Sequence, residues 1–430
     1  MTHSTTTRRA NAAPARDRRK DSAGETAVPW TQRIFAYGGF DYPFLVLVLV
    51  LLCIGVVMMF SASYVNAANH KASNYDAFFY LKRQAAYAVL GIIIMLLASK
   101  INLAFLRKAA VPVLLLAFAL LVAVLVIPSK EDFKRWIYIG SFQFQPSEIA
   151  KIALILFFAY AMEKFQKPQF TPAARGAGML PAKTFAQRVQ RFWARWNGTI
   201  LYVGVLALAA VLIYKENHVS GTVITLGIGA MMIFIGEQRI PLWFYFAATA
   251  AAVAVIIAVL KKPDLLPPHA AERIVSFLHR EQDQSGDNWQ TIQSLRTIGS
   301  GGLLGQGLGQ SRQKYGYLPE PQSDFVFAIV CEELGFVRSF GILLLYVALV
   351  WRGFMIALHT KERFGSLLVM GIVLQVGLQT ALNIGVVTAT LPNTGIPLPF
   401  FTYGGTALVI LLGEMGIVLA VSRVARQIKL

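Results

Sequence analysis

The sequence predicts an all-α integral membrane protein with about ten transmembrane helices and a large extracellular loop between helices 7 and 8. Hydrophobic residues make up 56% of the 430 residues and charged residues only 14%, the reverse of the balance in a soluble globular protein. The apolar residues are grouped in runs of about 20, long enough to cross a ~30 Å hydrocarbon core. Cys53 and Cys331 both fall within apolar runs, so the sequence indicates neither a disulfide framework nor a zinc site.

Ten apolar runs are predicted to span the membrane. Lys and Arg are more frequent in the segments that an intracellular N-terminus would place in the cytoplasm than in the outer segments. Because positive residues flank spanning helices mainly on the cytoplasmic side, both termini are predicted to be cytoplasmic. The runs cover about residues 42–62, 80–98, 109–127, 147–162, 198–214, 219–236, 242–260, 325–351, 365–387 and 403–422.

Basic segments flank a single polytopic membrane domain, residues 41–425. Residues 1–40 are predicted to form a disordered basic cytoplasmic tail, and residues 426–430 a short cytoplasmic C-terminal tail. In the basic cytoplasmic loop 163–197, aromatic and cationic residues alternate between Phe185 and Trp196, which favours an amphipathic helix at the membrane surface over a partner-docking helix. These flanks carry most of the net charge of +18, so no nucleic-acid partner is expected.

The large extracellular loop, residues 261–324, is the one sizeable segment expected outside the membrane. Loops of this length in compact proteins are usually functional. Its glycine cluster, Gly299 to Gly309, lacks the Lys-Ser/Thr pair of a phosphate-binding loop. Tight turns and close backbone packing are the predicted use of these glycines.

Acidic residues surround the start of the eighth span. Ser323-Asp324 before a long apolar run is a natural helix N-cap, and a capping carboxylate that faces a cavity could also accept a proton. Glu332 lies about 80° around the helix from Asp324, and Glu333 lies roughly opposite it, so the three cannot all line one cavity. At least one of these glutamates is expected to pair with a cation from another span.

A second polar group precedes and enters the fourth span. Pro146-Ser147-Glu148 is a strong helix start, and Glu148 and Lys151 are spaced to pair on one helix face. The group is either a capped helix with an internal ion pair, or a site where Arg135 and Lys151 meet a diphosphate. No His, Cys and carboxylate grouping has the spacing of a metal site.

Four stretches together resemble the SEDS family (shape, elongation, division and sporulation), which includes FtsW and RodA. The resemblance covers roughly residues 40–425, and the end of the first span, Met59 to Ser63, with the basic tail looks more like FtsW than RodA. The stretches are Arg135-Trp-Ile with Gln145-Pro-Ser-Glu-Ile-Ala-Lys151; Ile298-Gly-Ser-Gly-Gly-Leu-Leu-Gly-Gln-Gly-Leu-Gly309; Tyr317-Leu-Pro-Glu with Ser323-Asp-Phe-Val-Phe and Glu332-Glu-Leu-Gly335; and Asn383, Leu391-Pro and Gly395-Ile-Pro-Leu-Pro-Phe-Phe-Thr-Tyr403-Gly-Gly405.

The resemblance implies a peptidoglycan glycosyltransferase of the bacterial cytoplasmic (inner) membrane that polymerises lipid II into glycan strands at the division septum. The transfer would invert the sugar and release undecaprenyl diphosphate. The implied partners are lipid II, the nascent glycan strand, a class B penicillin-binding protein transpeptidase and other divisome membrane proteins. No cofactor is certain, although a divalent cation, Mg²⁺ or Mn²⁺, could assist.

The same resemblance assigns roles to residues of this chain. Asp324 matches the essential acidic residue and would be the catalytic base. Substrate-binding residues would be Arg135, Ser147, Glu148 and Lys151, while Glu332, Glu333, Tyr403, Gly404 and Gly405 would support the cavity.

Two departures from the family pattern and three alternative functions stay open. Relatives often have Pro-Asp where this chain has Asn217-His218, so a role for that Asp cannot be carried over. Arg338 stands where a small glycine is expected and must find a carboxylate or reach the membrane surface. The alternatives are a lipid II flippase or other transporter, a non-catalytic divisome scaffold, and a RodA-like elongation polymerase.

Overall fold

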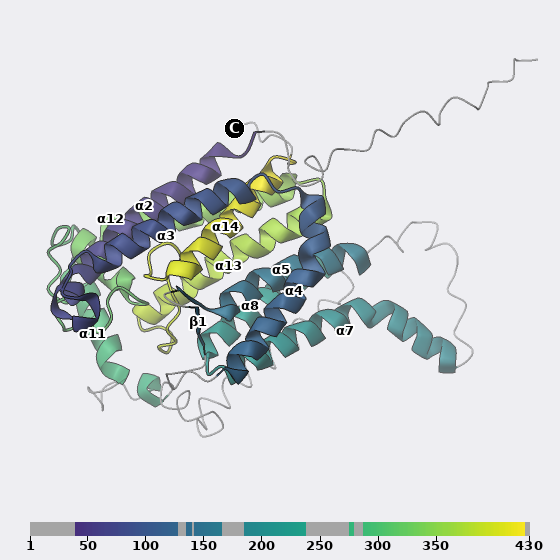
Figure 1. The fold of residues 1–430 in the computed structure, drawn as a ribbon, viewed down its shortest axis with the longest axis horizontal. Coiled ribbons are helices and arrows are strands. Elements are labelled where there is room, and N and C mark those ends of the chain that lie inside the picture. The colour runs from purple at the N-terminus through teal and green to yellow at the C-terminus, as the bar shows by residue number, and fades with distance from the viewer. Residues whose placement is uncertain are drawn as a thin grey trace, which may run out of the picture.

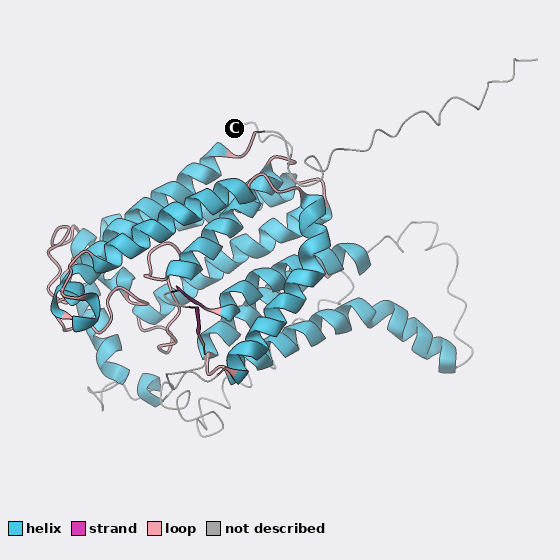
Figure 2. Cartoon of the chain, viewed as in Figure 1, coloured by secondary structure: helices cyan, strands magenta, loops and turns pink. Residues whose placement is uncertain are grey.

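The structure is a computed structural model that describes residues 39–127, 135–139, 142–165, 185–237, 275–278 and 287–425. The described residues are mainly long helices, with one short β-hairpin (Figure 2). The predicted span at 242–260, the N-terminal tail up to residue 38 and the C-terminal tail at 426–430 lie outside this part of the chain.

Ten long helices make up the described fold, together with the 3₁₀ helix η1 (Lys71–Ser73). The hairpin pairs β1 (Ile137–Ile139) with β2 (Phe142–Phe144) in antiparallel register. The helices are α2 (Tyr42–Asn69), α3 (Phe79–Ala98), α4 (Leu103–Val126), α5 (Pro146–Phe165), α7 (Phe185–Lys215), α8 (Val219–Gly236), α11 (Asp287–Ser300), α12 (Val326–His359), α13 (Arg363–Val387) and α14 (Gly405–Ser422).

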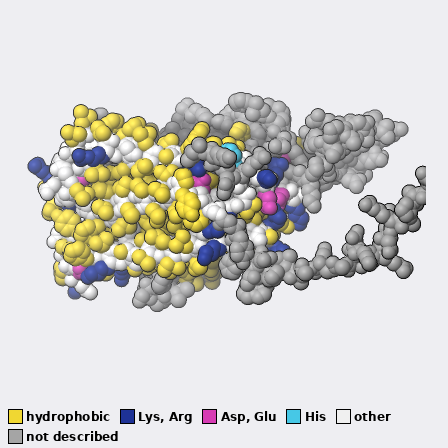
Figure 3. Space-filling model, turned by 90° about the horizontal axis from the view of Figure 1, so that it is seen from above, with side chains coloured by type: hydrophobic (Ala, Val, Ile, Leu, Met, Phe, Trp, Pro, Cys, Tyr) yellow, Lys and Arg dark blue, Asp and Glu magenta, His cyan; other side chains and the backbone are white. Residues whose placement is uncertain are grey.

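Eight of the described helices are long and apolar enough to cross a membrane, in agreement with the predicted fold class. They are α2, α3, α4, the Gly198–Lys215 part of α7, α8, α12, α13 and α14. Helix α5 forms at the predicted fourth span but is not among the eight, because charged residues occupy both of its ends. Exposed apolar side chains cover much of the described surface on the left of Figure 3, as expected for a lipid-facing surface.

Helix packing places α13 at the centre of the bundle. On one side, α12 packs against α13 and α2, and α14 packs against α3. On the other side, α4 packs against α5, and α7 against α8 (Figure 1). Helix α13 contacts both groups through α12, α5 and α8, so its residues can reach a site between them.

Helix α7 corrects one sequence prediction. Residues 185–196 are helical, as expected, but they continue without interruption into the predicted fifth span at 198–214 rather than forming a separate surface helix. Figure 1 shows this first part of α7 extending beyond the other helices. No Pro or Gly interrupts the chain between Phe185 and Trp196, so helix propagation across this segment is favourable.

The glycine cluster packs against a break in α12. Gly335 has φ 77° and ψ 176°, so the helix is interrupted there. The freed backbone groups bond to the cluster: Gln306 N–H donates to Glu332 O at 3.0 Å, and Phe336 N–H donates to Gly302 O at 2.9 Å. A Cβ at Gly305 would lie 2.3 Å from Glu333 O. The prediction that these glycines serve close backbone packing is therefore confirmed.

Arg338 follows the break and also bonds to the cluster. Its guanidinium donates to Leu304 O at 3.0 Å. The sequence predicted a carboxylate partner or an extended side chain at the membrane surface, whereas the structure supplies a backbone carbonyl of the glycine cluster. The nearby break explains this, because it brings the cluster's carbonyls within reach of α12.

Candidate active site

One cavity gathers most of the residues that the sequence singled out. It has a volume of about 270 Å³ and is bounded by α5, α8, α13 and α14 together with segments around the hairpin, Asp324 and residues 395–404. Its size is close to the lower end of the ~300–1,000 Å³ typical of ligand pockets. The predicted site residues that line it are Asp324, Arg135, Ser147, Glu148, Lys151, Tyr403 and Gly404.

Three predicted residues lie outside the cavity lining. Gly405 begins α14, where a Cβ would lie 2.3 Å from the ring of Tyr87, so its role is close helix packing. Glu332 and Glu333 belong to a separate buried network on α12, described below.

Asp324 lies at the cavity wall and does not cap α12. The helix begins at Val326, its N-cap position is Phe325, and no side chain makes a capping hydrogen bond there. The capping prediction is therefore wrong. The residue that can reach the first amides of a helix is the N-cap itself, and Asp324 lies one position too early. Its carboxylate instead lies beside Gly395, whose Cβ position would be 3.4 Å from Asp324 Oδ2.

Tertiary hydrogen bonds hold the backbone around Asp324. The Asn383 side chain on α13 donates to Asp324 O and to Ile396 O, each at 2.7 Å. Thr402 Oγ1 donates to Ser323 O at 3.0 Å, and Tyr403 N–H donates to Gln322 O at 2.9 Å. The carboxylate is thus placed by α13 and the 395–404 segment, two elements that are remote in sequence.

The start of α5 forms the opposite polar wall. The helix begins at Pro146, as the sequence predicts. Lys151 Nζ lies 2.9 Å from Glu148 Oε1, and only 3% of the Lys151 side chain is exposed. The predicted ion pair is therefore present, and it lies on the cavity lining rather than on the lipid-facing surface.

The turn between α7 and α8 holds Arg135. The Arg135 guanidinium donates to Asn217 O, and Asn217 adopts the left-handed conformation with φ 57°. His218 Nδ1 lies 3.2 Å from Gln145 Nε2 and 3.3 Å from Ser147 Oγ. Burial, with the positive charges of Arg135 and Lys151, lowers the pKa of His218 to about 3. A neutral His218 can therefore accept a hydrogen bond from the Gln145 amide.

Glu216 in the same turn is an additional titratable group near Arg135. Its side chain is fully buried, and neither carboxylate oxygen has a hydrogen-bond partner within the described part of the chain. Burial raises the pKa of Glu216 to about 8, and the charge of Arg135 opposes that rise. At neutral pH this carboxyl group is mainly protonated, so it does not neutralise Arg135.

The cavity also contains polar residues that the predicted site set omits. Gln375 and Gln379 from α13 and Glu414 from α14 line it. Gln375 Nε2 donates to Glu414 Oε2 at 2.9 Å. A carboxylate inside an apolar span is itself a signal of function, so Glu414 could have been added to the predicted site from sequence. The two glutamines carry no such signal until α13 is packed against α14.

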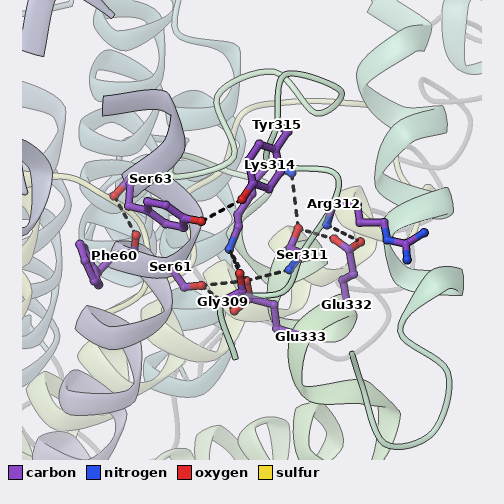
Figure 4. Close-up of polar contacts among 11 residues, drawn as sticks. Phe60, Ser61, Ser63, Gly309, Ser311, Arg312, Lys314, Tyr315, Glu332 and Glu333 are labelled. Carbon is purple, nitrogen blue, oxygen red and sulfur yellow. Dashed lines mark hydrogen bonds and ion pairs between the residues drawn. The ribbon is translucent and has the colours of Figure 1, made fainter. Parts of the chain in front are cut away.

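Glu332 and Glu333 accept hydrogen bonds from the segment that leads to Asp324 (Figure 4). Glu332 accepts from the hydroxyl of Ser311 and the amide of Arg312. Glu333 accepts from the Ser61 hydroxyl on α2, at 2.8 Å and 2.6 Å for its two oxygens, and from Lys314 Nζ at 2.9 Å. We call Ser61, Ser311, Lys314, Glu332 and Glu333 the loop clamp.

The predicted cationic partner of these glutamates is wrong, as the contacts of the loop clamp show. The sequence predicts a cation from another span, whereas Lys314 comes from the segment between α11 and α12. The side chains of Lys314 and Glu333 are both fully buried, and the Lys314 ammonium also lies 4.7 Å from the centre of the Tyr64 ring. The loop folds back onto α12 at its break, which brings Lys314 within reach of Glu333.

The described residues contain no group of three or more His, Cys, Asp and Glu side chains that could hold a metal ion. Mg²⁺ or Mn²⁺ that arrives with a substrate diphosphate stays a prediction.

Together, the fold and the cavity define a polytopic helical membrane protein with a polar cavity whose lining includes Asp324, Arg135 and Lys151. Residues 42–427 match the FtsW/RodA/SpoVE family, described as "Cell cycle protein". Stage V sporulation protein E of Bacillus subtilis is 37% identical over 390 residues, covering 90% of this chain and 98% of that protein. A protein of Geobacter sp. strain M18 named "Probable peptidoglycan glycosyltransferase FtsW" is 34% identical over 387 residues, covering 89% and 97%.

Solved structures show the same fold. One, described as "Structural coordination of polymerization and crosslinking by a peptidoglycan synthase complex", has a TM-score of 0.67 and 26% identity, covering 89% of this chain and 98% of that chain. The rod shape determining protein RodA of Thermus thermophilus has a TM-score of 0.58 and 24% identity, covering 90% and 98%. The chain belongs to the FtsW/RodA/SpoVE family, the SEDS proteins.

Proposed function

We propose that this glycosyltransferase-family protein polymerises lipid II into peptidoglycan strands. The observation that carries the proposal is the cavity in which Asp324 shares one lining with Arg135 and Lys151. Transfer of a sugar from a lipid diphosphate requires a base for the attacking hydroxyl and positive charge for the leaving group. This cavity offers both.

In the proposed reaction, the 4-hydroxyl of the acceptor N-acetylglucosamine attacks C1 of the N-acetylmuramic acid on the growing lipid-linked strand. A new O4–C1 bond forms as the bond from C1 to the diphosphate oxygen breaks, and that oxygen leaves with the electron pair. The hydroxyl proton passes to Asp324 and then to water. Attack from the side opposite the leaving group inverts C1. A positioned base of this kind contributes about 10²–10⁴-fold to the rate.

Arg135 and Lys151 would stabilise the departing undecaprenyl diphosphate. Arg135 is held by the carbonyl of Asn217, and its guanidinium is charged at any ordinary pH. Lys151 is already paired with Glu148, so its ammonium would move toward, or share, the diphosphate as that group becomes more negative. Ser147 and neutral His218 would hold the start of α5 in place.

The proposed setting is the septum of a dividing bacterium, in the cytoplasmic (inner) membrane with both termini inside. The names of the FtsW relatives support the division role, and a structural neighbour described as a peptidoglycan synthase complex supports work alongside a class B penicillin-binding protein transpeptidase. Other divisome membrane proteins complete the proposed partners.

A lipid II flippase is the second candidate, because α12 is broken at Gly335 and broken helices are common in transporters. The break argues only weakly for transport. Its backbone groups are paired with the glycine cluster, and Gly335 does not line the cavity. A non-catalytic scaffold and a RodA-like elongation polymerase are the remaining alternatives.

One experiment separates these functions. Purified full-length protein, alone and with its partner transpeptidase, is incubated with labelled lipid II, and both glycan polymer and lipid II movement across vesicles are measured. We expect polymer from the wild type and almost none from Asp324→Ala. Equal polymer from both would show that Asp324 is not the base. Lipid II movement without polymer from either would establish transport, and neither activity would favour a scaffold.

A further inference from the structure

His218 lines the cavity in the same region as the two cations of the proposed site. It lies directly before α8 and shares the cavity lining with Arg135 and Lys151. Both cations act on its ring electrostatically. The ring also fills the space that Gly221, in the first turn of α8, leaves open, because a Cβ at Gly221 would overlap the ring at Nδ1. His218 is therefore a closely packed group beside both positive charges.

The hydrogen bonds of His218 show which ring nitrogen carries the proton. Nδ1 lies 3.2 Å from Gln145 Nε2 and 3.3 Å from Ser147 Oγ. An amide nitrogen donates and does not accept, so Nδ1 is the acceptor from Gln145 and carries no proton. Burial and the two neighbouring cations lower the pKa of His218 to about 3, so the ring is neutral at pH 7. A neutral imidazole has one proton, which is therefore on Nε2.

The Nε2–H group of His218 is a donor without an acceptor. Within the described residues, Nε2 makes no hydrogen bond, and it is not one of the enclosed atoms that lack a partner. It differs in this respect from the carboxylate oxygens of Glu216 in the same turn, which are enclosed. Because His218 lines the cavity, a ligand there can reach Nε2–H, and that ligand must offer an acceptor.

The two cations beside His218 indicate the charge of that acceptor. Arg135 and Lys151 attract an anion into the region of the cavity that His218 also lines. Phosphate oxygens are strong acceptors, and their hydrogen bonds are strengthened by the negative charge. A neutral ring adds one such bond without adding a third positive charge, which the two cations would repel in the empty cavity.

We propose that His218 is a third binding residue for the diphosphate of the substrate lipid, donating from Nε2–H to a phosphate oxygen. The proposal rests on the proposed function and deepens it, because it adds a neutral donor to the cations Arg135 and Lys151. It also gives each ring nitrogen a separate task. Nδ1 ties the start of α5 through Gln145 and Ser147, and Nε2 contacts the substrate.

Two substitutions separate the two ring nitrogens. The amide oxygen of asparagine is two bonds from Cβ, as Nδ1 is, so His218→Asn keeps an acceptor for Gln145 and removes the donor. The amide nitrogen of glutamine is three bonds from Cβ, as Nε2 is, so His218→Gln keeps the donor and removes the acceptor at the position of Nδ1. The test measures equilibrium binding of undecaprenyl diphosphate to the full-length wild type and both variants, with undecaprenol as the lipid without phosphate.

The two variants should differ in their affinity for the diphosphate. His218→Asn should bind undecaprenyl diphosphate about tenfold or more weakly than the wild type, as expected for loss of a hydrogen bond to a charged group. His218→Gln should stay within about threefold of the wild type, because its amide still donates. Undecaprenol binding should change in neither. His359→Asn is the matched control, since His359 bonds to Met355 O and does not line the cavity. It should change no affinity.

Nitrogen-15 spectra test the tautomer without relying on the stability of His218→Asn. In wild-type protein labelled on its histidine nitrogens, the signals of His218 are those missing from His218→Gln. We expect the proton on Nε2, and a change in the Nε2 signal when undecaprenyl diphosphate is added. A proton on Nδ1, or an Nε2 signal unchanged at saturating undecaprenyl diphosphate, would overturn the proposal.

Three binding results would also overturn it. Equal losses in both variants, or a larger loss in His218→Gln, would assign His218 a structural role only. Unchanged affinity in His218→Asn would show that no such donor contributes, while a wild type that polymerises lipid II leaves the proposed function intact. A loss confined to inorganic diphosphate, measured separately, would show that Nε2 meets a free anion rather than the lipid. If the wild type neither binds undecaprenyl diphosphate nor polymerises lipid II, the proposed function fails and the donor role with it.

Discussion

Two buried Lys–Glu pairs have the same geometry but different surroundings. Lys151–Glu148 and Lys314–Glu333 each have an N–O distance of 2.9 Å. The first pair lies on the cavity lining, where Glu148 is still partly exposed. The second is fully enclosed by Ser61, Ser311 and the ring of Tyr64. The N–O distance of an ion pair alone therefore does not show whether the pair serves catalysis or stability. The open space and the hydrogen-bond partners around the pair distinguish the two roles.

The comparison suggests different costs for breaking each pair. Loss of Lys151 removes a charge that faces a cavity able to hold substrate, so catalysis should suffer most. Loss of Lys314 leaves a carboxylate without its cation in a closed site, so stability should suffer most. The predictions below test this division of roles.

Within this comparison of the two ion pairs, the largest expected effect is that of Lys151→Met on catalysis. Removal of one preorganised group that stabilises transition-state charge typically costs about 10²–10³ in kcat. We expect polymerisation by Lys151→Met to fall by at least this factor at saturating lipid II. A rate within about threefold of the wild type would remove Lys151 from the proposed mechanism.

Lys314→Met should mainly reduce stability. Breaking a buried ion pair by removing one partner costs roughly 3–5 kcal/mol. Thermal and denaturant unfolding in the same detergent measure this loss. The double variant Lys314→Met/Glu333→Met is the control, because it leaves no unpaired charge and should recover most of the stability. If Lys314→Met unfolds like the wild type, the loop clamp does not hold the loop.

Gly305→Ala should destabilise the protein by disturbing the packing of the glycine cluster against the break in α12. Gly305 has φ 81°, and an added Cβ would lie 2.3 Å from Glu333 O. Strain at a positive φ and overpacking together predict a loss of about 1–3 kcal/mol. Gly341→Ala is the matched control in α12, since its Cβ would meet nothing within 4 Å. Equal unfolding temperatures for the two variants would contradict the packing described here.

The smallest expected effect is a pH-dependent change in stability at Glu216. The folded chain holds the pKa of Glu216 at about 8, above the ordinary value of 4.5. The folded state therefore binds the proton more tightly, and the stability this group contributes is lost as pH rises from about 4.5 to about 8. Glu216→Gln removes the titration, so its advantage in unfolding temperature over the wild type should grow across that range.

We expect this advantage to increase by roughly 2–4 °C for each kcal/mol of stability that the wild type loses, as in larger domains. His218 titrates in both proteins and should cancel in the difference. A difference that is constant between pH 5 and pH 8 would show that Glu216 is ionised throughout.

Local sequence rules predicted some of the site well. Pro146 starts α5, and the spacing of Glu148 and Lys151 places both on one helix face, because both features depend only on neighbouring residues. The long apolar helices follow from composition for the same reason. The grouping of Asp324 with Arg135 and Lys151 came from the family resemblance, since no local rule links residues so far apart.

The remaining features depend on tertiary contacts. Asp324 does not cap α12, because α13 and the 395–404 segment hold its backbone through Asn383 and Thr402. The break at Gly335 exists because the glycine cluster pairs with the freed backbone groups. The hydrogen bond between Gln375 and Glu414 forms only when α13 and α14 pack together. None of these contacts leaves a periodic or compositional signal in the sequence.

The most direct test of the account is the polymerisation rate of Asp324→Asn at saturating lipid II, measured together with its unfolding temperature and its affinity for undecaprenyl diphosphate. Asparagine keeps the shape of the side chain but cannot accept the hydroxyl proton. We predict a rate about 10²–10⁴-fold below the wild type, with stability and diphosphate affinity unchanged. A rate close to that of the wild type would contradict the assignment of Asp324 as the catalytic base.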